Sequence, residues 1–314
     1  MSRPVIQRPE MLTATLDLGG APISLADYAT TGLMTVSVGP RGHGKTNVCL
    51  LMAEQLSDQG WVSVLIDPEN EIESLYGKAV SGPEELLERL ARRDKPILVV
   101  SASDATEFVP YGKAILQAAD EHRKPIFVVI DEGQLFSATR RRGDDIGAAA
   151  DIINDFAGRG RKRALDLAIT ALRYTGTLHR TLFSSKNLTL LGAQEDSTAW
   201  GSLAPQFRAS GITFSDLNAL SPGEFFCISR RGIEKVAVPM AEALKGVAPK
   251  ARPVKRVLPA TYMQWSRALA DIPTERLDAL SDPVITLLGA VSGLSPAQMQ
   301  SGIAALDDEL GMRE

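Results

Sequence analysis

The stretch Gly39-Pro40-Arg41-Gly42-His43-Gly44-Lys45-Thr46 matches the pattern G-x-x-x-x-G-K-[ST]. An apolar run, residues 33–38, precedes it, and a helix-compatible stretch, residues 46–56, follows it. In this setting the glycines let backbone N–H groups turn inward, and the helix start adds a positive dipole. Lys45 is expected to reach the β- and γ-phosphates of a nucleoside triphosphate, and Thr46 to hold Mg²⁺. The pattern therefore predicts an ATP site built from Gly39, Gly42, His43, Gly44, Lys45, Thr46 and Asn47.

A second motif, Pro125-Ile126-Phe127-Val128-Val129-Ile130-Asp131-Glu132, supplies the other half of such a site. Its five consecutive apolar residues predict a strand buried on both faces of a parallel sheet. Asp131 would hold the Mg²⁺ shell, and Glu132 would polarise the water that attacks the γ-phosphate. The alternative is a core strand followed by a chance acidic turn. Adjacent carboxylates favour hydrolysis over nucleotide storage.

Composition sets the outer limits. The chain has 314 residues, of which 44% are hydrophobic and 23% charged, with a formal net charge of −4. These values predict a soluble globular protein of one large or two smaller domains. We find no candidate membrane span or signal peptide and expect a cytoplasmic protein, in the host cytoplasm or the virion if the chain is viral. The cysteines and histidines are too scattered to indicate a disulfide framework or a zinc site.

Strand-like and helix-like segments alternate along most of the chain, which predicts an α/β fold with a mainly parallel, doubly wound sheet. Ligands bind at the carboxyl ends of such strands. The chain between the two motifs has room for two strands, which suits the RecA/ASCE-like P-loop NTPases, where another strand lies between the two motifs in the sheet. We divide the chain into an N-terminal strand and loop region (1–30), an ATPase core (31–245), a linker (246–260) and a C-terminal helical segment (261–314). That last segment could pack on its own core, seal a neighbour in a ring, or bind another protein.

Several segments, in order, resemble the HerA/FtsK superfamily of ring-forming, DNA-pumping ATPases. Besides the two motifs, they are Ile66-Asp67-Pro68-Glu69-Asn70-Glu71 and Phe156-Ala157-Gly158-Arg159-Gly160-Arg161-Lys162-Arg163. The resemblance implies that Arg161 or Arg163 reaches into the neighbouring subunit's site and assists catalysis there; the alternative is a solvated basic helix end. The sequence departs from the family at Leu172, where a polar residue is usual. Thr170 or Arg173 would have to sense the γ-phosphate instead, or the relay of nucleotide state is altered.

The run Arg140-Arg141-Arg142 is the candidate DNA contact. A ring could point this polar, glycine-containing loop at phosphates in its channel, where several subunits add their attractions. The alternative is a solvated loop partly neutralised by Asp144 and Asp145. The acidic total charge gives no global footprint for nucleic acid, so backbone contact without sequence readout is expected.

Together these patterns predict an ATP-driven translocase of double-stranded DNA that works as a hexameric or pentameric ring. A viral genome-packaging ATPase and a HerA-like translocase both fit, and the sequence leaves open whether a portal, capsid or nuclease partner accompanies the ring. Two rivals remain. One is a nucleotide-dependent switch or assembly ATPase acting on a protein partner, and the other is a small-molecule kinase in which Glu132 or Asp67 activates an acceptor hydroxyl.

Overall fold

A computed structural model gives the structure of the chain. It describes residues 13–122, 124–137, 144–174, 178, 180–194 and 197–246, except for the side chains of 144, 159–163, 180–181 and 197–198. The chain divides into two units, 1–246 and 247–314. The second unit lies outside the described residues, so the linker and the helical segment placed there remain predictions. No helix in the described part of the chain is long and apolar enough to cross a membrane.

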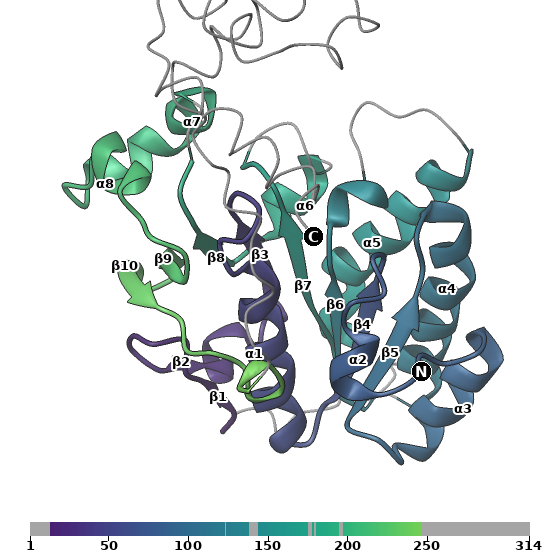
Figure 1. Cartoon of the computed structure of the whole chain (residues 1–314). Helices are drawn as coiled ribbons and strands as arrows, with labels where there is room; N and C mark the ends of the chain where they lie inside the picture. Colours follow the sequence, from purple (N-terminus) through teal and green to yellow (C-terminus); the bar gives the residue numbers. More distant parts are fainter. Residues whose placement is uncertain are drawn as a thin grey trace, which may run out of the picture. The chain divides into compact units, whose positions relative to one another are not determined.

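An eight-stranded sheet forms the centre of the first unit, in the order β10-β9-β8-β3-β7-β6-β4-β5 (Figure 1). The six strands from β8 to β5 run parallel, while β9 and β10 form an antiparallel hairpin at one edge. The mainly parallel α/β sheet predicted from the sequence is therefore confirmed. The strands are β3 (Met34–Val38), β4 (Val62–Asp67), β5 (Ile97–Ser101), β6 (Ile126–Ile130), β7 (Leu165–Ala171), β8 (Leu188–Leu191), β9 (Glu224–Ser229) and β10 (Gly232–Ala237).

Strand β7 lies between β3 and β6, so a strand does separate the two motifs in the sheet, as predicted. The register places Thr170 beside Ser37 of β3 and places Ile169 beside Ile130 of β6. Residues that follow these strands therefore meet at one carboxyl edge. Every residue of β3, β6 and β7 is buried, as expected for the central strands of a parallel sheet that is covered on both faces. Only β6 is apolar throughout.

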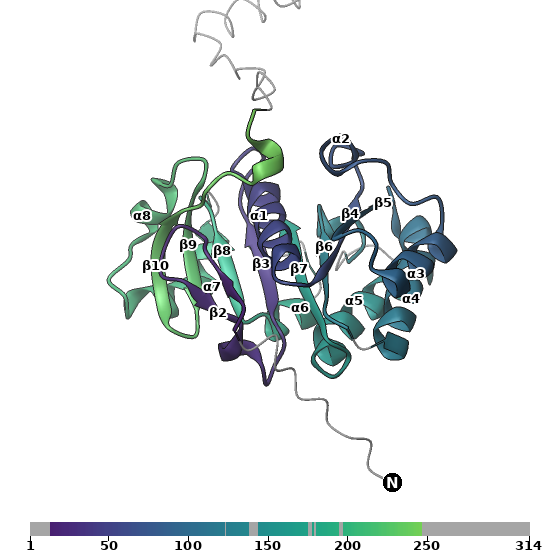
Figure 2. The ribbon, with the colours of Figure 1, turned by 90° about the horizontal axis from the view of Figure 1, so that it is seen from below.

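Helices cover both faces of the sheet (Figure 2). One face carries α1 (Lys45–Asp58) and α2 (Glu73–Tyr76), which pack with the small hairpin β1 (Thr15–Leu16) and β2 (Ile23–Ser24). The other face carries the remaining helices, whose apolar side chains form a second buried cluster. They are α3 (Pro83–Arg92), α4 (Ala105–His122), α5 (Asp144–Arg163), α6 (Arg180–Ser185), α7 (Ser197–Arg208) and α8 (Phe214–Asn218).

Two features of the helices differ from expectation. Helix α4 begins at Ala105, before the stretch 112–122 for which the sequence pattern alone predicts a helix. Pro110 is the sixth residue of this helix, so the helix lacks the bond that an N–H at this position would donate to the Thr106 carbonyl. The Asp104 carboxylate accepts the Glu107 N–H at 3.0 Å and so caps the first turn. Helices α6, α7 and α8 were not predicted.

Two glutamines of α1 hold the N-terminal hairpin against the helix. The Gln59 amide accepts the Thr15 N–H at 2.9 Å and donates to the Thr15 carbonyl at 2.8 Å. Gln55 makes the same pair of bonds with Asp17, at 2.7 and 2.8 Å. Each glutamine side chain thus bonds to both the N–H and the carbonyl of one residue, which are the two bonds that a residue of a neighbouring strand would make.

Candidate nucleotide site

The phosphate loop joins β3 to α1 and has the backbone that its glycines allow. Gly42 and Gly44 have φ values of 69° and 100°, in the left-handed region that favours glycine. Gly44 is the residue before α1, and an added Cβ there would lie 3.7 Å from the Gly223 nitrogen. The Gly39 N–H donates to the Ala171 carbonyl at 3.2 Å, which ties the loop to the end of β7. The conformation of the loop is therefore held by its glycines and by its bond to β7, without a ligand.

Lys45 is the first residue of α1 and is only 5% exposed. Its Nζ donates to the Pro40 carbonyl at 3.1 Å, across the loop. Burial lowers the pKa of Lys45, and the charges of Glu132 and Asp131 act in the opposite direction. The ammonium therefore sits in a partly desolvated position where an anionic ligand would restore favourable surroundings.

Asp131 connects α1 to the sheet. The Thr46 hydroxyl donates to Asp131 Oδ2 at 3.0 Å, and the Thr170 hydroxyl donates to Asp131 Oδ1 at 2.6 Å. A hydroxyl and a carboxylate are oxygen donors of the kind that Mg²⁺ prefers, and Mg²⁺ commonly takes its remaining ligands from water and substrate phosphates. Among the described residues no group of three or more His, Cys, Asp or Glu side chains could hold a metal by itself. The pair Thr46 and Asp131 thus fits a cation shared with phosphates.

Glu132 follows directly and has a left-handed backbone, with φ of 46°. This conformation is uncommon for a residue other than glycine. Its N–H donates to Thr170 Oγ1 at 2.8 Å, and Gln134 Nε2 donates to its carboxylate. Backbone and side chain of Glu132 are therefore both held at the carboxyl edge of β6.

Thr170 links Asp131 to Glu132, and it is fully buried. Its hydroxyl donates to Asp131 and accepts from the Glu132 backbone, so one side chain touches both residues of the acidic pair. Of the two substitutes named for the apolar Leu172, the structure places Thr170 in contact with the site, whereas the Arg173 side chain is exposed. Strand alternation puts Thr170 on the same face as Ala168, which packs towards α1.

Two residues predicted to bind the nucleotide have side chains engaged elsewhere. His43 is 3% exposed, contacts the Glu224 carbonyl through Nε2 at 2.9 Å and packs edge-on against Phe225 with ring centroids 5.1 Å apart. Asn47 bonds to Pro239 and Ala241. Their side chains are structural in this fold, so only their backbones remain available for phosphate contact. The G-x-x-x-x-G-K-[ST] pattern constrains the backbone of the loop and says little about these side chains.

The predicted arginines lie apart from the local site. Arg161 and Arg163 belong to the last turn of α5, and their side chains are outside the described part of the structure. Because only one residue separates the end of α5 from the start of β7, both arginines lie at the amino edge of the sheet, opposite Thr170. Arg140, Arg141 and Arg142 lie outside the described residues.

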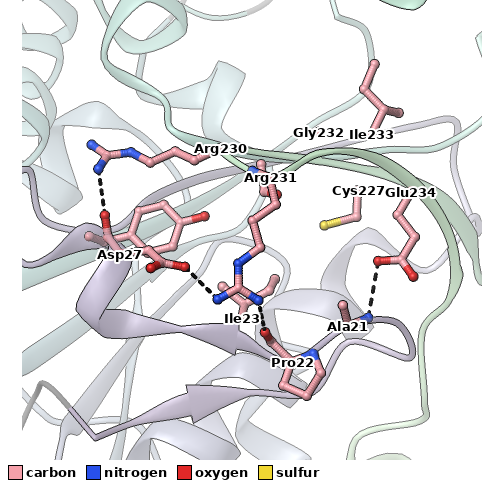
Figure 3. Close-up of a pocket in the computed structure, with 12 residues that line it drawn as sticks. Ala21, Pro22, Ile23, Asp27, Cys227, Arg230, Arg231, Gly232, Ile233 and Glu234 are labelled. Atoms are coloured by element: carbon pink, nitrogen blue, oxygen red, sulfur yellow. Dashed lines mark hydrogen bonds and ion pairs between the residues drawn. The ribbon is translucent and has the colours of Figure 1, made fainter. Parts of the chain in front are cut away.

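A pocket of about 290 Å³ lies between the N-terminal hairpin and the β9–β10 turn (Figure 3). Arg231 crosses it, bonding to Asp27 Oδ2 at 2.9 Å and to the Pro22 carbonyl at 3.1 Å. Arg230 donates to the Asp27 carbonyl at 2.6 Å. Burial is the main cause that raises the pKa of Tyr28, at its edge, to about 12. Because β9 runs antiparallel to β8, this pocket lies at the amino edge of the parallel strands, whereas the phosphate loop lies at their carboxyl edge. The two arginines of the pocket hold the N-terminal hairpin against the sheet.

Comparisons with known proteins bear on the fold of the chain. No family model matches the chain. Over 150 residues it is 29% identical to the DNA repair and recombination protein RadB of Halobacterium salinarum, in an alignment that covers 46% of this chain. The matched region spans 61% of RadB.

Two solved structures share the fold. The genome packaging NTPase B204 from Sulfolobus turreted icosahedral virus 2, in complex with AMPPCP, superimposes with a TM-score of 0.52 at 15% identity, covering 66% of this chain and 98% of B204. The pCW3 conjugation coupling protein TcpA, in complex with ATPγS, gives a TM-score of 0.50 at 16% identity, covering 78% of this chain and 71% of TcpA. Likeness at this level of identity shows the fold, so the P-loop NTPase fold implied by the resemblance is confirmed. Both of these structures hold an ATP analogue.

Proposed function

We propose that the chain is an ATP-driven motor that moves double-stranded DNA through a ring of its own copies. The observation that carries the proposal is a direct structural link from the hydrolytic carboxylates to the basic end of α5. Thr170 touches both Asp131 and Glu132, and only one residue separates its strand, β7, from the end of α5 at Arg163. A change at the carboxylates would thus reach a surface that can face a neighbouring subunit.

Within one subunit, Lys45, Thr46 and Asp131 would hold Mg-ATP, with the ion neutralising charge on the phosphates. Glu132 would orient the attacking water and accept its proton. Thr170 would keep the acidic pair in register, because its hydroxyl bonds to both residues. These residues come from α1, β7 and the turn after β6, and meet at one edge of the sheet.

The arginine part of the mechanism requires a second copy of the chain. From Arg163 to Thr170 the chain advances about 23 Å, at about 3.3 Å for each residue of an extended strand. That span is longer than an arginine side chain, so Arg161 and Arg163 cannot reach the phosphates of their own subunit. We infer that one of them completes the neighbour's site, which makes hydrolysis depend on ring assembly.

DNA would lie in the channel of the ring, contacted by Arg140, Arg141 and Arg142 from each subunit. The loop follows η3 (Gly133–Leu135), which begins directly after Glu132. The sequence distance from the water-orienting glutamate to the first of these arginines is therefore short. Hydrolysis would move the loop, and the arginines would draw the phosphate backbone without reading sequence. A hexamer or pentamer and a portal, capsid or nuclease partner belong to the same proposal.

The test is steady-state ATP hydrolysis with and without long double-stranded DNA, together with native mass. We expect DNA to stimulate the wild type, Lys45→Ala to abolish hydrolysis, and Arg161→Ala/Arg163→Ala to abolish the stimulation while ATP still binds. Arg92→Ala is the matched control, because its side chain is 67% exposed on α3 and pairs only across the surface with Glu88 in the described structure.

Hydrolysis that ignores DNA and survives without the arginines would refute the motor. It would favour the alternative of a nucleotide-dependent switch that acts on a protein partner. The kinase alternative loses one of its candidate residues in the structure. Asp67 is 2% exposed, and its two oxygens accept the N–H groups of Glu69 and Ile72, at 3.3 and 2.7 Å. The Asp67 carboxylate therefore stabilises the turn that follows β4 and is not free to activate an acceptor hydroxyl.

A further inference from the structure

The segment that follows β10 lies against the first turn of α1, beside the phosphate loop (Figures 1 and 2). Asn47 Nδ2 donates to the Pro239 carbonyl at 2.9 Å, and Asn47 Oδ1 accepts the Ala241 N–H at 2.8 Å. Met240 is the residue between these two bonds. It is therefore held by the side chain that directly follows Thr46 in α1.

The same segment is bonded to the phosphate loop through one intermediate turn. The Val238 N–H donates to the Gly223 carbonyl at 2.9 Å, and the Gly223 N–H donates to the His43 carbonyl at 2.9 Å. Further along, Glu54 of α1 accepts the N–H groups of Glu242 and Ala243, at 2.7 and 2.9 Å. These last residues open the turn η4 (Glu242–Leu244). The backbone of Met240 is thus fixed on both sides relative to the loop.

Met240 itself is left uncovered. Its side chain is 54% exposed, and it is the exposed large hydrophobic residue found in the described part of the chain. A single exposed apolar residue is ordinary by itself. Met240 is distinguished by its position, because its long apolar side chain is exposed to solvent close to the phosphate loop.

The direction of a bound nucleotide follows from the charges around the loop. The γ-phosphate end belongs with Lys45, Asp131 and Glu132, on the side where Thr46 meets Asp131. The Asn47 side chain follows about 100° further round the helix and points to Pro239 and Ala241 instead. The nucleoside end must leave the loop away from the carboxylates, which is the side where Asn47 holds Met240.

We propose that Met240 forms a platform for the nucleobase of the bound nucleoside triphosphate. The thioether of methionine makes favourable contacts with aromatic rings, and its flexible chain adapts to a flat base. Asn47 is then a positioning residue, since it holds the platform rather than the nucleotide. This inference rests on the proposed ATPase function and adds to it the side chain that contacts the base.

The experiment compares ATP with inorganic tripolyphosphate, which has the phosphates but no base, by calorimetry in the presence of Mg²⁺. Met240→Ala should weaken ATP binding about tenfold and leave tripolyphosphate binding within about twofold of wild type. Met240→Leu should keep most of the ATP affinity. Asn47→Leu, which releases the segment, should show the same selective loss. Lys245→Ala, an exposed change five residues away, is the control.

Equal weakening of both ligands by Met240→Ala, or no weakening of either, would overturn the platform. The same holds if the wild type binds ATP no more tightly than tripolyphosphate. Lys45→Ala separates this from the proposed function, because it should abolish binding of both ligands. A wild type that binds neither ligand would overturn the proposed ATPase function itself and the platform with it.

Discussion

Replacing Thr170 with valine removes one hydroxyl and keeps a β-branched side chain of nearly the same shape. In the wild type that hydroxyl donates to Asp131 Oδ1 at 2.6 Å and accepts the Glu132 N–H at 2.8 Å. Thr170 is fully buried, so water cannot replace either bond. The variant leaves Asp131 with its Thr46 contact and leaves the Glu132 N–H without its partner.

The size of the effect follows from those two bonds. A hydrogen bond to an ionised group contributes about 1.5–3 kcal/mol, and a buried N–H left unpaired costs about 1–3 kcal/mol. Part of this loss falls on folding, and part on the geometry of Glu132, whose left-handed backbone is held by the lost bond. For the chemical step we expect a loss of about 2 kcal/mol of transition-state stabilisation, which is a fall of about 30-fold in rate.

The assay is single-turnover hydrolysis at saturating ATP, with ATP affinity measured separately. We expect Thr170→Val to slow hydrolysis by about 30-fold while ATP affinity changes less than about threefold. Thr170→Ser should recover most of the rate, because it restores the hydroxyl. A valine variant that hydrolyses ATP at the wild-type rate would refute the reasoning, and so would a serine variant as slow as valine.

The remaining predictions concern neighbouring buried groups. Thr35 is a buried threonine of β3, but its hydroxyl has no hydrogen-bond partner among the described residues. Thr35→Val should therefore raise the free energy of unfolding by about 1 kcal/mol and leave the hydrolysis rate unchanged. Asp166 is 1% exposed and accepts the Leu33 N–H at 2.9 Å and Trp61 Nε1 at 3.1 Å, so Asp166→Ala should lower that free energy by about 3 kcal/mol in urea unfolding. Burial lowers the pKa of Lys45 below 10.5. Between that lowered pKa and 10.5 the unfolded chain binds more protons than the nucleotide-free folded protein, so the free energy of unfolding rises as the pH rises through this window. Lys45→Met should therefore be more stable than wild type at pH 7, with a difference that shrinks towards pH 10; a difference that grows with pH would contradict the assigned pKa shift.

Local patterns in the sequence predicted the parts of the site that depend on backbone. The glycines of the phosphate loop need left-handed angles, and Gly42 and Gly44 adopt them. The apolar run that ends at Ile130 could only be a buried strand, which carries Asp131 and Glu132 to the carboxyl edge. The distance between the two motifs along the chain even indicated that another strand, β7, would separate them in the sheet.

Side-chain partners distant in sequence were not predictable in the same way. Sequence reasoning assigned Asn47 to the nucleotide, yet its partner Pro239 lies 192 positions away. It left Thr170 and Arg173 as equal candidates, and only the register of β7 beside β6 brings Thr170 to the Asp131 carboxylate and the Glu132 backbone N–H.

The sequence by itself determined the phosphate loop, the acidic strand end and the α/β order, because each depends on residues within a few positions of one another. Tertiary structure alone decided where His43, Asn47 and Thr170 point. A side chain on a helix or strand can face several neighbours, and packing of distant segments selects which of them supplies its hydrogen bonds.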